Sequence, residues 1–234
     1  MKAHQRIMRE KLAMTEVAPT GIDLSIGSSE VREITPAEAS KIILKYEYLK
    51  RMSVSPWHCF GIFFGGEIAG AVVFSNEYAE NLGVWDKYGY TGKIILLSRG
   101  ACVHWAHPHA GSKLISTSIR MLPPKFEVVT ATVDPDAGEI GTLYQACNFF
   151  YVGSMRKKRG KKNRAAYLVD GKRVSARTLR DKYGTQVAAE KAGAVRFNQP
   201  SKGRYFFFRG RKTTRTAHRK AIDHLMEPYP RRQT

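Results

Sequence analysis

The sequence has few cysteines and no long apolar segment. Its three cysteines, Cys59, Cys102 and Cys147, show no CxxC spacing, so we expect reduced thiols inside a core rather than a zinc site. No run of about 18 apolar residues occurs, and a transmembrane span is therefore not expected. The first residues, MKAHQRIMREKLAM, lack the apolar centre of a secretory signal, and we expect them to form a frayed tail or a short basic helix. Together these absences predict a cytoplasmic protein with no membrane partner.

Acidic residues are scarce in the last third of the chain. Residues 1–150 carry 15 basic and 15 acidic side chains, whereas residues 151–234 carry 24 basic and 5 acidic ones, which places the whole net charge of +19 there. Such an asymmetry indicates a polyanionic partner, most often nucleic acid. A basic tail that only aids solubility is the alternative. The segment also holds strand-like patterns and aromatic residues, which such a tail does not need.

The first 153 residues predict a sheet flanked by helices. Thr35-Pro36-Ala37-Glu38 is a capping box that opens a helix over residues 36–49. Two apolar runs, residues 60–64 and 67–75, flank Gly65-Gly66 and predict a hairpin. A polar segment over residues 76–91 predicts a long surface loop. Further on, strand and helix patterns alternate, which predicts a mixed α/β (α+β) fold with parallel pairing in its second half.

Three regions follow from these patterns: an N-terminal tail over residues 1–30, a catalytic domain over residues 31–153 and a basic extension over residues 154–234. The extension begins with the basic segment MRKKRGKKNR. It continues with a hairpin around Asp170-Gly171, a short helix, the strand RYFFF and a last helix. We expect this extension to contact nucleic acid.

The segment VDPDAGEIGTLYQACNFFYVG, residues 133–153, carries the densest set of candidate functional residues. It predicts a strand, then acids and glycines, then a short helix. Asp134 at the carboxyl end of a strand is well placed to accept a proton, or it caps the following turn. Tyr144 can donate a proton from its phenol, or it is a core tyrosine. Asp136 is expected to be a turn residue.

Earlier in the chain, SRGACVHWAHPHAGSKLIS joins a strand to a helix. Arg99 lies in an apolar strand and needs an anionic partner, which is either Asp134 or a group of a bound molecule. Gly111 and Ser112 at the helix start can hold one phosphate or carboxylate. His104, His107 and His109 have a spacing compatible with a metal, although scattered loop histidines are commoner.

The element order is that of the GNAT acyltransferase fold, and TLYQACNFFYVG resembles the ending of that superfamily. The glycine-rich loop that binds coenzyme A in those enzymes does not occur here, so acetyl-CoA is a doubtful donor. The SRG and HAGSKLIS segments and the 133–153 segment together resemble the phage Mom family. The resemblance continues through YLVDGKRVSARTLRDKYG, RYFFF and AIDHLMEPYP, from about residue 34 to residue 230.

The resemblance implies a divergent GNAT-like fold, with a mixed central sheet flanked by helices, and an enzyme of phage DNA. It would attach a carbamoylmethyl group to the N6 amine of adenine, from a small or activated glycine-type donor, and so protect DNA from host restriction. It implies catalytic roles for Arg99, Ser112, Asp134 and Tyr144, and it makes iron a possible cofactor. The family's His-Tyr-Ser reads Glu47-Tyr48-Leu49 here, which weakens any assignment of metal ligands.

Duplex DNA must present an extrahelical adenine to such an enzyme. Tyr48, Trp57, Trp85 and Tyr88 are candidates for stacking on that base, with ordinary packing as the alternative. The predicted phosphate contacts are the basic residues of the extension: Arg156, Lys157, Lys158, Arg159, Lys161, Lys162, Arg164, Arg209, Arg211, Lys212, Arg215, Arg219 and Lys220.

Two other classes of function remain open. One is a GNAT N-acetyltransferase that uses acetyl-CoA on an amine, which acetyl-CoA turnover by the purified protein would reveal. The other is a DNA-binding protein without catalytic activity on the same scaffold, for which the adenine of expressing cells would stay unchanged.

Overall fold

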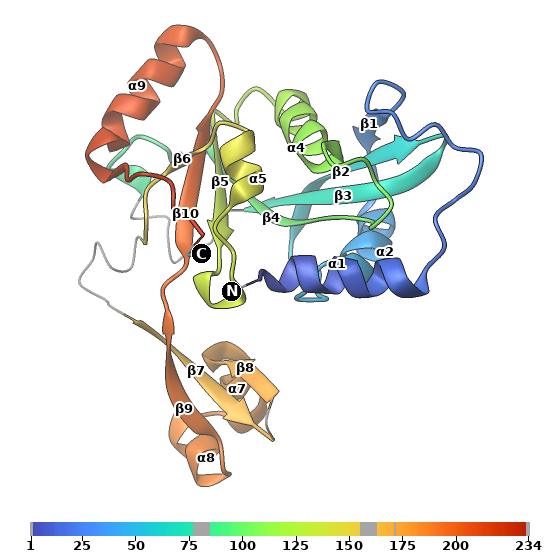
Figure 1. Ribbon diagram of the computed structural model, residues 1–234. Coiled ribbons are helices and arrows are strands. Elements are labelled where there is room, and N and C mark those ends of the chain that lie inside the picture. The colour runs from blue at the N-terminus through green and yellow to red at the C-terminus, as the bar shows by residue number, and fades with distance from the viewer. Residues whose placement is uncertain (1, 77–84, 155–162, 171, 233–234) are drawn as a thin grey trace.

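A seven-stranded sheet in the order β1-β2-β3-β4-β5-β10-β6 forms the centre of the molecule (Figure 1). The computed structural model describes residues 2–76, 85–154, 163–170 and 172–232. Helix α4 (Ala110–Met121) covers one face of strands β2 to β4, and helix α2 (Pro36–Tyr46) covers the other. The prediction of a mixed α/β sheet flanked by helices is confirmed.

The first four strands are antiparallel: β1 (Glu30–Glu33), β2 (Pro56–Phe64), β3 (Glu67–Asn76) and β4 (Ile94–Cys102). The predicted hairpin is confirmed at Gly65 and Gly66, whose φ angles of 53° and 87° suit a turn that glycine adopts without strain. The capping box is also confirmed, because the Thr35 and Glu38 side chains each bond the other's backbone N–H.

Strands β4 and β5 (Val128–Val133) are parallel and then part. They pair from Ile94 opposite Val128 to Leu97 opposite Ala131. Beyond Leu97, β4 stays paired with β3, while the end of β5 pairs with β10. The two strands therefore leave an opening between them, as expected when neighbouring parallel strands take different partners.

Strand β10 (Gly203–Phe208) comes from the predicted extension, yet it lies inside the main sheet. It pairs antiparallel with β5 on one side and with β6 (Phe150–Tyr151) on the other. Its aromatic side chains explain this position, since Tyr205 and Phe206 are fully buried. The expected domain boundary near residue 153 stays a prediction. After that residue the chain returns to the main sheet as strand β10.

The rest of the extension forms a small separate sheet in the order β8-β7-β9. It consists of β7 (Asn163–Val169), β8 (Lys172–Ser175) and β9 (Val195–Pro200), with α7 (Ala176–Tyr183) and α8 (Gln186–Lys191). A small core of its own contains Tyr167, Leu179 and Ala189. The predicted hairpin of β7 and β8 is confirmed. The chain ends with α9 (Lys212–Ile222) and the short η2 (Asp223–Leu225).

Two expectations need correction. The helix predicted to reach residue 49 ends at Tyr46, because Glu47 already has extended backbone angles of −94° and 137°. The expected surface loop over residues 76–91 ends in the interior, since Trp85 and Tyr90 are buried in a second core cluster with Phe206; residues 77–84 of that loop lie outside the described ranges. The N-terminal segment, expected as a frayed tail or a short basic helix, forms helix α1 (His4–Thr15), which confirms the second alternative.

Within the described ranges, no helix combines the length and the apolar character needed to span a bilayer.

Candidate active site

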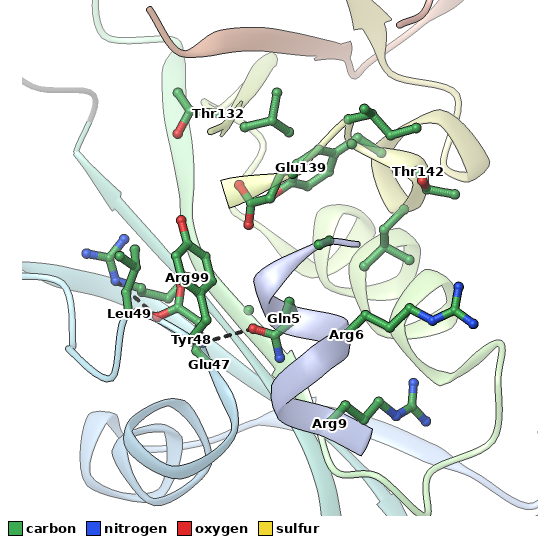
Figure 2. Close-up of a pocket in the computed structure, with 18 of the residues that line it drawn as sticks. Gln5, Arg6, Arg9, Glu47, Tyr48, Leu49, Arg99, Thr132, Glu139 and Thr142 are labelled. Carbon is green, nitrogen blue, oxygen red and sulfur yellow. Dashed lines mark hydrogen bonds and ion pairs between the residues drawn. The ribbon is translucent and has the colours of Figure 1, made fainter. Parts of the chain in front are cut away.

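A cavity of about 680 Å³ opens where β4 and β5 part. Its walls come from the end of α2, strands β4 and β5, the segment that connects the short η1 (Pro135–Ala137) to α5 (Thr142–Ala146), and helix α1. Glu47 and Tyr48 enter the cavity from one side and Glu139 from the other (Figure 2). The cavity thus gathers carboxylates and phenols from segments far apart in the sequence.

Arg99 and Glu47 form the charged pair of this cavity. The pairing of β3 with β4 contains a bulge, because Val73 lies opposite Arg99 whereas the next residue, Phe74, lies opposite Leu97. Such irregularities redirect the side chains of a strand. The Arg99 guanidinium donates to the carbonyls of Arg51 at 2.8 Å and Ser98 at 2.6 Å, and its Nε lies 3.7 Å from Glu47 Oε2. Arg99 therefore has Glu47 as its anionic partner.

The Glu47 carboxyl is the most perturbed acid of the site. Only 7% of the residue is exposed, and no described residue donates a hydrogen bond to its Oε2 atom. Burial raises its pKa to about 7, against the opposing effect of Arg99 and with a further increase from Glu139. A carboxyl group with this pKa exchanges a proton near neutral pH, as a general acid or base requires.

Glu139 and Tyr144 stand on the opposite wall. Glu139 Oε2 accepts the backbone N–H of Asp134 at 2.8 Å, and burial raises the pKa of this carboxyl group. Burial also raises the pKa of the Tyr144 phenol, and the negative charges of Glu139 and Glu47 raise it further. The Tyr144 ring packs on Phe149 and Tyr205, with ring centroids 5.4 and 5.5 Å away. Its phenol therefore stays protonated at neutral pH and is available as a proton donor.

Comparison with known proteins agrees with this arrangement. A profile of the Mom protein family matches residues 28–231. The chain belongs to the Mom protein family. It is 28% identical over 226 residues to the protein described as "Methylcarbamoylase mom" of Escherichia phage Mu, an alignment that covers 88% of this chain and 86% of the phage Mu protein.

Solved structures with a similar fold to this Mom-family protein include GNAT acetyltransferases. One is a GNAT family acetyltransferase from Elizabethkingia anophelis with acetyl-CoA bound, at 10% identity and a TM-score of 0.42 over 78% of this chain and 99% of that one. Another is a putative phosphinothricin N-acetyltransferase, at 11% identity and a TM-score of 0.45 over 79% and 100% of the two chains. Because these sequences are only 10% and 11% identical to the chain, the similarity is one of fold.

Asp134 of this Mom-family protein lies beside the cavity and is not among its lining residues. Its carboxylate accepts the backbone N–H of Asp136 at 3.2 Å and so caps η1. Its other oxygen lies 3.9 Å from Lys202 Nζ. The backbone N–H of Asp134 donates to Glu139. Glu139 is thus the carboxylate that enters the cavity from this segment, and Asp134 lies next to it.

Gly111 and Ser112 do not line the cavity either. The Ser112 hydroxyl donates to the carbonyl of His109 at 2.9 Å, within its own helix. A Cβ atom placed on Gly111 would lie 3.2 Å from the Leu143 side chain, so α5 covers the start of α4. These contacts do not form the cradle of free backbone N–H groups that a pyrophosphate needs, and the residues present do not fit coenzyme A.

The candidates for base stacking have different positions in this Mom-family protein. Tyr48 lines the cavity and is partly exposed. Trp57 is 45% exposed on β2, where it contacts Phe126 outside the cavity. Trp85 is 1% exposed and packs against Phe206, and Tyr88 packs beside it. Of these four residues, Tyr48 is the one that a base in the cavity can contact.

The histidines do not form a metal site with the carboxylates. His104 lines the cavity, with its Nδ1 atom 3.7 Å from Glu16 Oε2. His107 and His109 lie near each other in the loop before α4. In the parts of the chain that the structure describes, no three histidine, cysteine or acidic side chains come together in a way that could hold a metal ion. The residues present there do not fit iron.

The predicted phosphate contacts fall into four groups. Arg209 is engaged inside the fold, where it donates to the carbonyls of Leu122, Pro123 and Phe126 at 2.6–2.9 Å and so holds the end of α4. A second group is exposed on or next to α9: Arg211, Lys212, Arg215, Arg219 and Lys220. Arg164 lies in β7. The remaining predicted contacts lie outside the described residues: Arg156, Lys157, Lys158, Arg159, Lys161 and Lys162.

Sequence reasoning missed two of the site's features. Glu139 gave no signal beyond its place in a loop rich in acids and glycines, and only the fold shows that it enters the cavity. A short basic helix was one expectation for the N-terminal segment, but nothing in the sequence indicated that this helix provides Gln5, Arg6 and Arg9 to the cavity wall. One indication pointed to Glu47: it stands where the family pattern has a histidine. Burial raises the pKa of its carboxyl group to about 7, which makes this departure relevant to proton transfer.

Proposed function

We propose that this protein is a DNA-modifying transferase that attaches a carbamoylmethyl group to the N6 amine of adenine in phage DNA. The observation that carries the proposal is the cavity at the parting of β4 and β5, where Glu47, Arg99, Glu139 and Tyr144 meet in a member of the Mom family. Modified DNA would resist host restriction enzymes, and the protein would act in the cytoplasm of the infected cell.

The reaction needs a proton acceptor, because the adenine amine is a weak nucleophile whose lone pair is delocalised into the ring. In the proposed step, N6 forms a bond to the methylene carbon of an activated glycine-type donor, and the bond between that carbon and the leaving group breaks. The Glu47 carboxylate takes the proton that N6 loses. The leaving group departs with the bonding electrons and receives a proton from Tyr144. Arg99 favours the ionised form of Glu47 before the proton is transferred.

The target base must leave the duplex to reach this cavity. Tyr48 can stack on the extrahelical adenine. The exposed basic side chains of α9 and the basic segment over residues 155–164 are the proposed contacts for phosphates, which would supply affinity that depends on salt and not on base sequence.

Mass spectrometry of nucleosides from cells that make the protein tests the proposal. Digested DNA should contain a new deoxyadenosine derivative heavier by a carbamoylmethyl group, and cells with an empty vector should lack it. Tyr144→Phe removes the proton donor while keeping the ring that packs on Phe149, and it should lower the amount of the derivative by at least about tenfold. Unmodified deoxyadenosine in cells with abundant folded protein would contradict the proposal.

A further inference from the structure

Helix α1 lies outside the part of the chain that the family profile matches, which begins at residue 28. None of its residues is buried. It nevertheless closes one side of the cavity, where Gln5, Arg6 and Arg9 belong to the lining (Figure 2). One apolar side chain, Leu12, packs partly buried against the main core, and polar contacts hold the helix as well.

Those contacts reach two segments that border the cavity. The Gln5 side-chain amide donates from Nε2 to the carbonyl of Tyr46 and accepts the backbone N–H of Tyr48 at its Oε1 atom, at 3.0 Å. Arg9 Nη2 donates to the carbonyls of His104 and Ala106, at 3.1 Å each. Helix α1 thus connects the end of α2 to the loop that follows β4.

The two Gln5 contacts lie on either side of one residue, Glu47. Helix α2 ends at Tyr46, and Glu47 is extended, so the backbone on both sides of Glu47 needs partners from outside the helix. A primary amide is suited to this task because it donates and accepts hydrogen bonds at the same time. With both neighbours held, the Glu47 carboxylate is directed to Arg99 and the Tyr48 ring to the cavity.

We propose that Gln5 is a positioning residue of the active site, which holds the backbone on both sides of Glu47 and so fixes Glu47 and Tyr48 in the cavity. The inference rests on the proposed function, because Glu47 is taken there as the proton acceptor. It makes helix α1 a functional part of this enzyme, in addition to the segment shared with the family.

Gln5→Ala tests the proposal, since alanine keeps the helix propensity of α1 and removes both bonds. The assay uses purified full-length protein, plasmid DNA and the small-molecule filtrate of host cells as the source of donor, with modified deoxyadenosine measured by mass spectrometry. We expect the maximal rate to fall by roughly tenfold or more, because a misplaced proton acceptor slows the chemical step. The DNA concentration for half-maximal rate should stay within about twofold.

Lys11→Ala is the matched control. Lys11 is an exposed residue of the same helix and is not among the cavity-lining residues. This variant should keep the wild-type rate and melting temperature, and rates are measured well below the melting temperatures of both variants so that they report on folded protein.

Gln5→Glu separates positioning from general support of the fold. Its carboxylate can still accept the Tyr48 N–H, but it cannot donate to Tyr46 and it adds a negative charge near Glu47. The charged groups around Glu47 are Arg51, Arg99, Glu139 and Lys202, and all remain in the variant. We expect a lower rate at pH 7 and a pH–rate midpoint shifted upward, whereas Lys11→Ala should show no shift.

The outcomes distinguish this inference from the proposed function. If wild-type protein modifies adenine and both Gln5 variants match Lys11→Ala in rate and in pH midpoint, the positioning role is wrong and the proposed function stands. The positioning role is also wrong if the lower rates of the Gln5 variants are fully explained by a matching loss of thermal stability. If wild-type protein makes no modified adenine in cells, the proposed function itself fails.

Discussion

At the residue scale, the protonation of the Glu47 carboxyl group affects the stability of the fold. Its buried carboxyl group has a pKa near 7, above the ordinary value of 4.5. The folded state therefore binds a proton more tightly than the unfolded state, and stability falls as pH rises from about 4.5 to about 7. A shift of this size corresponds to at most about 3 kcal/mol. The acid proposed as the proton acceptor is thus a source of instability at neutral pH.

Glu47→Gln should remove this pH dependence. The variant has no charge to bury, so its free energy of unfolding relative to wild type should increase between pH 5 and pH 8, by at most about 3 kcal/mol. Denaturant titrations of both proteins at the two pH values measure the difference. Glu67→Gln, a change at an exposed residue at the start of β3, should show no such increase. An equal response of the two variants would mean that the Glu47 carboxyl group is not perturbed.

At the scale of elements, Arg209 shows why sequence alone misassigns a basic residue. It follows the strand RYFFF in the basic extension, and composition assigns it to the DNA surface. The structure pairs its guanidinium with carbonyls at and after the end of α4, where helices leave acceptors without partners. A single sequence does not reveal which distant carbonyls an arginine will meet.

Arg209→Ala should destabilise the fold by about 2–4 kcal/mol, because several buried carbonyls lose their donor together. Arg211→Ala, two residues later and exposed, should change the free energy of unfolding by less than about 0.5 kcal/mol. Chemical denaturation of the two variants measures the contrast. Similar stabilities would contradict the structural role of Arg209.

Local patterns predicted the elements well, and the fold decided what they did together. The capping box of α2 and the glycine hairpin depend on contacts between near neighbours, so the sequence contains the full signal for them. The entry of Glu139 into the cavity and the position of β10 between β5 and β6 depend on long-range pairing. For the segment of helix α1 the sequence left a tail and a helix as alternatives, because the helix buries no residue and therefore lacks the apolar periodicity on which helix prediction relies.

At the scale of the whole molecule, the charge is divided between a neutral part and a basic part. Helix α9 buries His218 and Ile222 against the main sheet and exposes Lys212, Arg215 and Arg219. Their spacing of three and four residues places them along one face of the helix. This face is suited to contact phosphates because the side chains project together into solvent.

Replacing Lys212, Arg215 and Arg219 together by alanine should weaken DNA binding and make it less sensitive to salt. The slope of log affinity against log salt should become less steep by about 3 if each side chain neutralises one phosphate. Replacing Lys11, Lys41 and Lys125, which are exposed in the neutral part, should leave the slope unchanged. Binding titrations over a range of salt concentrations compare the two triple variants. Equal slopes would exclude α9 as a phosphate-binding surface.

The central claim is that the cavity between β4 and β5 modifies the adenine amine with Glu47 as the proton acceptor. Tandem mass spectrometry of deoxyadenosine from cells that make wild-type protein, Glu47→Gln or Glu67→Gln tests it most directly. We predict an added carbamoylmethyl group on N6 for wild type and for Glu67→Gln, and a loss of at least about tenfold for Glu47→Gln at equal levels of folded protein. Undiminished modification by Glu47→Gln, or an adduct on another atom of adenine, would contradict the claim.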